Sequence, residues 1–181
     1  MLTNTDSRYG LVSRALHWLM ALMIVVLIAV GLYMSDLDQQ DAARVQIYAL
    51  HKSFGVTLLG LAILRILWIR ISLPPPLPAA LQTWERLLAR AVTGILYLLM
   101  IAAPVAGYLM SSAAGKPVGF FGLFTLPALV GESKDLAEAL QEVHEFLAWA
   151  ILALAGLHAL GALKHRFIDK DPSADVLGRM L

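Results

Sequence analysis

The sequence contains no cysteine and few charged residues. The absence of cysteine across the 181 residues excludes disulfides, thiolate-ligated haem and iron–sulfur clusters. Charged residues make up 15% of the chain and hydrophobic residues 59%, whereas soluble domains average about 25% and about 45–50%. Together with a mean hydropathy of +0.73, this composition predicts an integral membrane protein.

Four apolar segments are long enough to cross a bilayer. They lie near residues 15–34, 46–69, 87–110 and 145–163, and each has the roughly 20 residues that a hydrocarbon core about 30 Å thick requires. No small-residue cleavage site follows the first segment, so we expect it to be retained. The chain is therefore expected to be one all-α domain over residues 1–181, a bundle of four transmembrane helices without a soluble domain.

The distribution of lysine and arginine predicts the orientation of the bundle. One side carries ten basic residues and the other carries four, which are Arg44, Lys52, Lys116 and Lys134. The positive-inside rule then places both termini in the cytoplasm. On the outer side, Ser133 is the expected N-cap of the fourth helix, and the apolar loop over 111–132 is expected to lie at the membrane interface. The ten basic residues on the side assigned to the cytoplasm are Arg8, Arg14, Arg65, Arg70, Arg86, Arg90, Lys164, Arg166, Lys170 and Arg179.

Four histidines lie in or at the ends of the predicted spans. His144 and His158 are fourteen residues apart on the fourth helix, which separates them by about 21 Å within about 40° of one face. Helix direction puts His17 at the cytoplasmic level of His158, and His51 at the outer level of His144. A single interfacial histidine often has no ligand role, but ionisable groups in a span are costly and usually functional. The pattern predicts two haems, ligated by His17 with His158 and by His51 with His144.

Iron held by two imidazoles has no open coordination position, so such haems transfer electrons. The second ring nitrogen of each ligand needs a partner, and we expect a backbone carbonyl one helical turn back. His165 shares the face of His158 but follows the apolar run. We expect it to be a surface residue, with a quinone or proton-exchange site as the alternative.

Haem propionates need cationic partners, and three residues are candidates. Arg14 lies one turn before His17, and Lys52 follows His51 directly. For these two, topology signalling or snorkelling toward the interface is an equally good explanation. Arg65 is followed by four more apolar residues, so a propionate partner is favoured there.

Several stretches resemble the bacterial cytochrome b561 family over essentially the whole chain. They include Ser13-Arg-Ala-Leu-His-Trp18, His51-Lys-Ser-Phe-Gly55, Leu64-Arg-Ile-Leu-Trp68, the run from Leu96 to Gly107, His144-Glu, Leu157-His158 and the run from Leu163 to Asp171. The resemblance implies a four-helix dihaem b cytochrome of the inner membrane that exchanges electrons with quinone. One branch is similar to superoxide oxidases that reduce ubiquinone, which would make the chain an oxidoreductase. The family's ligand positions fall on His17, His51, His144 and His158.

One position departs from that branch, in which a histidine often lies four residues before the tyrosine of the third helix. Here that residue is Thr93, with Arg90 one turn earlier. Arg90, Lys164 and His165 are candidates for a quinone or anion site on the cytoplasmic side. Expected partners are ubiquinone or another quinone, superoxide, membrane lipid and a redox protein, but not nucleic acid. Two alternatives stay open: a cytochrome subunit relaying electrons for a separate dehydrogenase or hydrogenase, and a bundle with no redox role.

Overall fold

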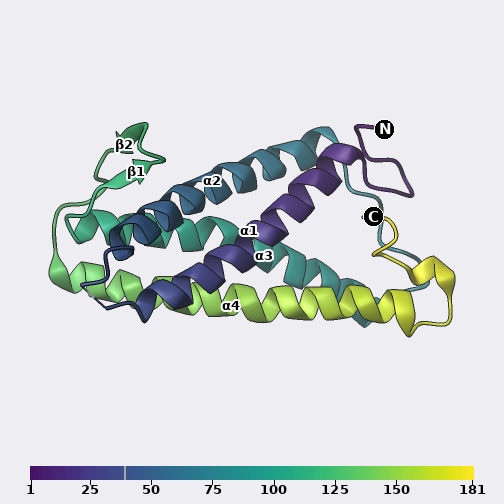
Figure 1. The fold of residues 1–181 in the computed structure, drawn as a ribbon. Helices are drawn as coiled ribbons and strands as arrows, with labels where there is room; N and C mark the ends of the chain where they lie inside the picture. Colours follow the sequence, from purple (N-terminus) through teal and green to yellow (C-terminus); the bar gives the residue numbers. More distant parts are fainter. Residues whose placement is uncertain (39) are drawn as a thin grey trace.

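Four long helices make up most of the chain in a computed structural model that describes residues 1–38 and 40–181. They are α1 (Leu11–Ser35), α2 (Arg44–Ile71), α3 (Thr83–Ala113) and α4 (Lys134–Phe167) (Figure 1). Each is long and apolar enough to cross a membrane, which confirms the four predicted spans. The helices extend beyond those spans at their ends. The expected N-cap of α4 is confirmed, because Ser133 accepts a hydrogen bond from the N–H of Leu136 at 3.4 Å.

The helices pack as two antiparallel pairs. α1 lies along α2 and α3 along α4, and α2 also packs on α3. One buried cluster joins α1, α2 and α3, and a second joins α3 and α4. Within the described residues α2 and α4 do not pack closely, so only side chains reach across between them. The first cluster consists of Met20, Leu58, Ala62 and Met100, and the second of Leu99, Ala103 and Ile151.

Both termini lie at one end of the bundle, here called the terminal end (Figure 1). The N–H of Tyr9 donates to the carbonyl of Arg179 at 3.1 Å, and the indole of Trp18 donates to the carbonyl of Met180 at 3.0 Å. The short 3-10 helix η1 (Pro172–Ala174) belongs to this tail. The arrangement puts the start of α1, the end of α2, the start of α3 and the end of α4 at the same level.

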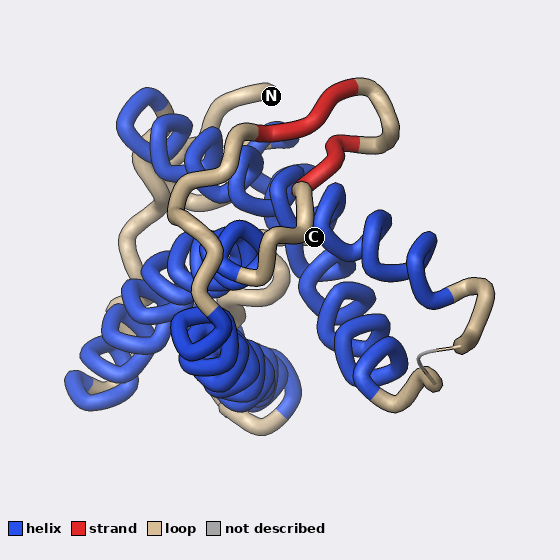
Figure 2. Tube along the Cα trace, turned by 90° about the vertical axis from the view of Figure 1, so that its left-hand side faces the viewer, coloured by secondary structure: helices blue, strands red, loops and turns tan. Residues whose placement is uncertain are grey.

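A small β-hairpin at the opposite end, here called the hairpin end, adds to the all-α fold expected from the sequence. Strands β1 (Val118–Phe120) and β2 (Phe124–Leu126) pair antiparallel (Figure 2). Residues 121–123 connect the strands, and the N–H of Leu123 donates to the carbonyl of Phe120 at 2.9 Å. The φ values of Phe121 and Gly122 within this turn are 48° and 74°, and positive φ at both central residues is typical of a type I′ turn. The N–H of Phe121 donates to Ser53 Oγ at 3.0 Å, which holds the hairpin against α2. The sequence did not predict these strands, because the apolar segment 111–132 was expected to be a loop at the membrane interface.

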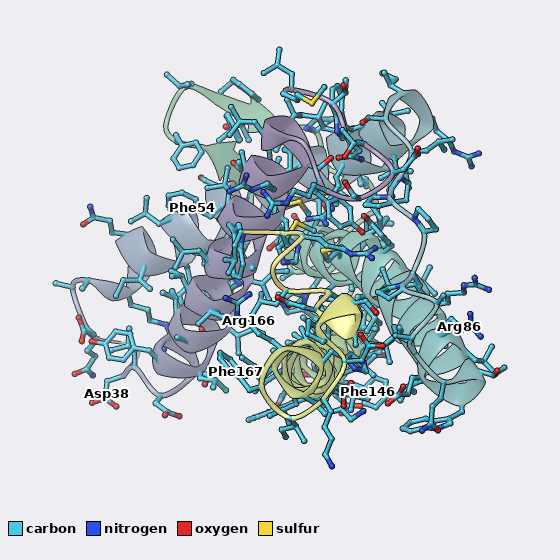
Figure 3. All side chains as sticks on the ribbon, turned by 90° about the vertical axis from the view of Figure 1, so that its right-hand side faces the viewer. Asp38, Phe54, Arg86, Phe146, Arg166 and Phe167 are labelled. Carbon is cyan, nitrogen blue, oxygen red and sulfur yellow. The ribbon has the colours of Figure 1, made fainter. Side chains whose placement is uncertain are left out.

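Large apolar side chains cover the outside of the helices. Phe146 and Phe167 on α4 are 71% and 72% exposed, and they lie on different sides of this helix in the view from the terminal end (Figure 3). Exposed apolar patches of this extent indicate a partner or a membrane. Because all four helices carry exposed apolar side chains and are long enough to span a bilayer, membrane lipid is the environment that fits them.

Candidate cofactor sites

Four histidines form two pairs between helices of the bundle, one toward each end. His17 of α1 faces His158 of α4 with ring centroids 6.2 Å apart. His51 of α2 faces His144 of α4 with centroids 6.3 Å apart. We call these the terminal-end pair and the hairpin-end pair. They are the same two pairs that matching of helix depth predicts.

The spacing within each pair suits a single metal ion between the rings. With metal–nitrogen bonds of about 2 Å and ring radii of about 1 Å, two imidazoles on one iron have centroids about 6 Å apart. The rings are inclined at 63° in one pair and 86° in the other. Nearly equal spacing in two pairs held by different helices is therefore compatible with a bis-imidazole centre at each end.

At the hairpin end, α3 positions the ring of His144. The nitrogen Nδ1 of His144 lies 2.8 Å from the carbonyl oxygen of Ala103, so it must donate, and Nε2 is left with its lone pair for a metal. A Cβ on Gly107 would lie 3.0 Å from Cε1 of the same ring, so glycine makes room for it. The expectation of a carbonyl one turn back on the same helix is wrong for His144, because the partner belongs to α3.

His51 completes this pair and has an unusual ring nitrogen. Its Nδ1 is buried and is without a hydrogen-bond partner in the residues that the structure describes. A buried polar atom without a partner costs about 1–3 kcal/mol. Gly31 of α1 lies against the ring, since a Cβ there would be 3.4 Å from Cε1 of His51. A buried imidazole with an unmet polar atom, packed against glycine, suits a bound group that the chain itself does not supply.

At the terminal end, Arg65 of α2 contacts His17 directly. One guanidinium nitrogen lies 3.2 Å from Nδ1 of His17, and Nε donates to the hydroxyl of Tyr97 at 2.9 Å. A guanidinium can only donate, so Nδ1 of His17 accepts here and a neutral ring carries its proton on Nε2. For Nε2 to bind a metal, the proton must move to Nδ1 and Arg65 must turn to another acceptor. His158, across from His17, is exposed.

The other two candidate propionate partners differ in their contacts. Lys52 donates to the carbonyl of Pro117 at 3.2 Å, so its ammonium is directed at the chain before the hairpin. Arg14 is partly buried, and its side chain makes no hydrogen bond or ion pair within residues 1–38 and 40–181. Its side chain is thus available to a group beside His17.

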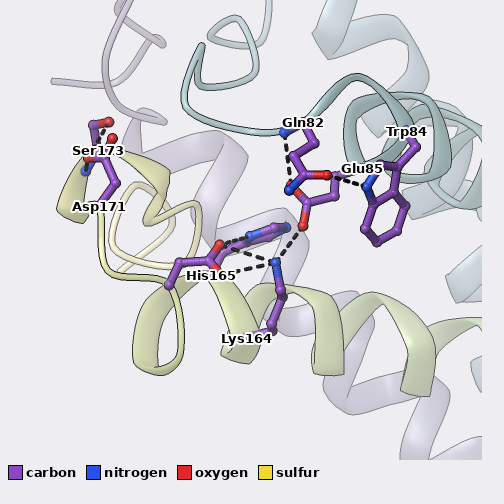
Figure 4. Close-up of polar contacts among 8 residues, drawn as sticks. Gln82, Trp84, Glu85, Lys164, His165, Asp171 and Ser173 are labelled. Atoms are coloured by element: carbon purple, nitrogen blue, oxygen red, sulfur yellow. Dashed lines mark hydrogen bonds and ion pairs between the residues drawn. The ribbon is translucent and has the colours of Figure 1, made fainter.

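The candidate quinone or anion residues do not form one cationic site. Arg90 is exposed and makes no polar contact with the described part of the chain. Lys164 pairs with Glu85 and, at 3.0 Å, with Asp169, while Nδ1 of His165 lies 2.6 Å from Asp169 (Figure 4). The expectation that His165 is a surface residue is wrong, because its side chain is only 11% exposed.

The acidic members of this group were not predicted from the sequence. Hydrogen bonds from His165 and Lys164 hold the pKa of the Asp169 carboxyl below its usual value. The four-residue spacing of His165 and Asp169 was a signal for that pair. Glu85 also closes the capping box at the start of α3, since its side chain accepts from the N–H of Gln82 at 2.9 Å. No local signal connected Glu85 with Lys164, which is 79 residues away.

Comparison with known proteins identifies the chain's relatives. The family model described as "Prokaryotic cytochrome b561" matches residues 8–179. "Cytochrome b561 homolog 2" of Escherichia coli (strain K12) is 43% identical over 180 residues, covering 99% of this chain and 94% of the relative. "Probable superoxide oxidase CybB" of Yersinia pestis is 29% identical, covering 91% and 92%. "Cytochrome b561 homolog 1" of Escherichia coli is 24% identical, covering 91% and 93%.

Proposed function

Because the chain belongs to the prokaryotic cytochrome b561 family, we propose that it carries two haems b, one at each histidine pair, and exchanges electrons with quinone. Membership makes it a multi-pass protein of the bacterial inner membrane that binds b-type haem and transfers electrons. The proposal of two haems per chain is supported by the two histidine pairs, whose ring centroids lie 6.2 and 6.3 Å apart.

The protein's part in this function is to position ligands and to exclude other chemistry at the iron. His17 with His158 and His51 with His144 would each hold one haem, which would supply a one-electron centre without an open position for substrate. The bond from His144 to the carbonyl of Ala103 fixes the tautomer and orientation of that ligand. Gly107 and Gly31 keep the rings of the hairpin-end pair free of neighbouring side chains.

Arg65 is proposed as the propionate partner of the terminal-end haem. Its present contact with Nδ1 of His17 must be released when that ring binds metal through Nε2, and a carboxylate is the acceptor a guanidinium prefers. Arg14, one turn from His17 and free of polar contacts with described residues, is placed to support the same group. Lys52 can serve the hairpin-end haem after leaving the carbonyl of Pro117.

The terminal end is proposed to face the cytoplasm. Ten basic residues lie on that side of the bundle against four on the other, and the positive-inside rule assigns the richer side to the cytoplasm. The His17–His158 haem is then the inner one and the His51–His144 haem the outer one.

Superoxide is the candidate electron donor that a relative's name favours, since "Probable superoxide oxidase CybB" is 29% identical to this chain. In that reaction two superoxide anions each lose one electron and become dioxygen. One ubiquinone gains both electrons and takes up two protons to become ubiquinol. A relay of electrons for a separate dehydrogenase or hydrogenase is the alternative.

Two measurements on the purified protein test this function. Haem content per chain and a reduced-minus-oxidised spectrum should give two b haems with nitrogenous axial ligands. Reduction of the haems is then followed under a superoxide flux and, separately, with ubiquinol. A content of one haem per chain would refute the dihaem assignment. Haems that stay oxidised under superoxide but are reduced by ubiquinol would refute the superoxide assignment and leave the relay function.

A further inference from the structure

A second group of ligand-type side chains lies at the terminal end, outside the histidine pairs. Glu85, Lys164, His165 and Asp169, here called the terminal cluster, bring together the start of α3, the last turn of α4 and the segment that follows it (Figure 4). Glu85, His165 and Asp169 each offer a ligand atom, and these three atoms lie within 4.8 Å of one another. We propose that these three residues bind a divalent transition metal of the Zn²⁺ type, and that Lys164 is a tethered cation that the metal displaces.

The burial of the three ligands separates them from ordinary surface acids. The side chains of Glu85, His165 and Asp169 are 7%, 11% and 21% exposed. Carboxylates and imidazoles are seldom this buried unless they are paired or coordinate a metal. Glu85 lies at the start of α3, far in sequence from His165 and Asp169, so packing of α3 against α4 brings the three together.

Lys164 already shows where a cation binds in the cluster. Its ammonium contacts carboxylate oxygens of both Glu85 and Asp169, yet its side chain is 40% exposed. A long, flexible lysine can turn its charged end into water at little cost, whereas the buried carboxylate of Glu85 cannot follow it. Two carboxylates face this one ammonium, and a doubly charged ion would match their two negative charges.

The donor set selects among metals. Nδ1 of His165 now donates to Asp169 at 2.6 Å and would release its proton on binding a metal. One imidazole nitrogen and two carboxylate oxygens are then typical ligands of Zn²⁺, with a fourth position left for water. Mg²⁺ and Ca²⁺ prefer oxygen ligands alone, so they should compete poorly. His165 follows His158 by about two turns on the same face of α4, so a metal here would lie beyond the terminal-end histidine pair, toward the end of that helix.

The alternative is an ion-pair clamp in which Lys164 is the permanent partner. The two explanations differ in how removal of Lys164 affects the stability of the protein and its affinity for metal. A clamp loses its only cation, and the protein is destabilised whether or not metal is present. A metal site loses its competitor, and affinity for the metal increases.

The test uses haem-loaded, full-length protein in detergent and a calorimetric Zn²⁺ titration. Lys164→Met should tighten Zn²⁺ binding about tenfold or more, and His165→Gln should weaken it by a similar factor, as expected for loss of a ligand. Lys170→Met is the matched control, because this exposed lysine is close in sequence but outside the cluster, and it should leave binding unchanged. A tenfold excess of Mg²⁺ should also leave it unchanged.

Thermal unfolding supplies a second readout that stays informative if a variant is unstable. In chelator, Lys164→Met should unfold at a lower temperature than the wild type, because Glu85 is left buried without a counter-ion, and Zn²⁺ should reverse that loss. Zn²⁺ binding that is equal in the wild type and His165→Gln, or a Lys164→Met variant that Zn²⁺ neither binds more tightly nor stabilises, would overturn the proposal in favour of the clamp. None of these readouts depends on electron transfer.

Discussion

Gly107→Ala adds one methyl group against the ring of the proposed hairpin-end ligand His144. The new Cβ would lie 3.0 Å from Cε1 and 3.1 Å from Nδ1 of that ring, closer than the roughly 3.5–4.0 Å at which carbon atoms are in optimal contact. The ring must therefore move by a few tenths of an ångström or turn about its bond to α4. Either movement strains the 2.8 Å hydrogen bond to Ala103.

The expected magnitude follows from the two interactions that change. Overpacking in a filled site costs about 1–3 kcal/mol, and a strained hydrogen bond forfeits part of its net value of about 0.5–1.5 kcal/mol. Since alanine gains up to about 1 kcal/mol over glycine in helix propensity, global stability should change little. The loss should appear locally, as binding of the hairpin-end haem weakened about tenfold.

Haem content and the low-spin ferric signals in electron paramagnetic resonance distinguish the two haems. One signal should shift or decrease in Gly107→Ala while the other stays as in the wild type. Gly94→Ala is the matched control, because it lies in the same helix and nothing lies within 4 Å of its added Cβ. The reasoning is refuted if both signals are unchanged in Gly107→Ala, or if Gly94→Ala produces the same loss.

Three further predictions concern ligation, orientation and pH. His51→Ala should remove one haem and keep the other, and His165→Ala should keep both; haem loss in the His165 variant with both retained in His158→Ala would contradict the pairing. A reporter fused to the C-terminus should be active only in the cytoplasm, and periplasmic activity would invert the assigned haem levels. Because the pKa of the Asp169 carboxyl is lowered in the folded protein, its stabilising contribution is complete above the unfolded pKa of about 3.9 and is lost as the pH falls further. Thermal unfolding at stepwise lower pH should therefore show a decrease that Asp169→Asn reduces, and an identical acid profile in the variant would argue against it.

The sequence by itself determined the four spans and the levels of the histidines along them. Span length, apolar composition and rise per residue are local properties of a helix in lipid. They fix how deep His17, His51, His144 and His158 lie, and depth alone was sufficient to pair them. The start of α4 at Ser133 was also predictable, because an N-cap is a contact within one turn.

Only the tertiary structure decided which groups contact those residues. Ala103 meets His144, Arg65 meets His17, and Glu85 meets Lys164 across 41, 48 and 79 residues of sequence. These contacts depend on how the helices cross and rotate against one another, which hydrophobic periodicity does not specify. The hairpin at Phe121 was hidden for a related reason, since its turn has a phenylalanine at φ 48° and is held by Ser53 of another helix. The depth of a residue in the membrane depends on its position along its own helix, whereas its contact partners depend on how that helix packs against the others.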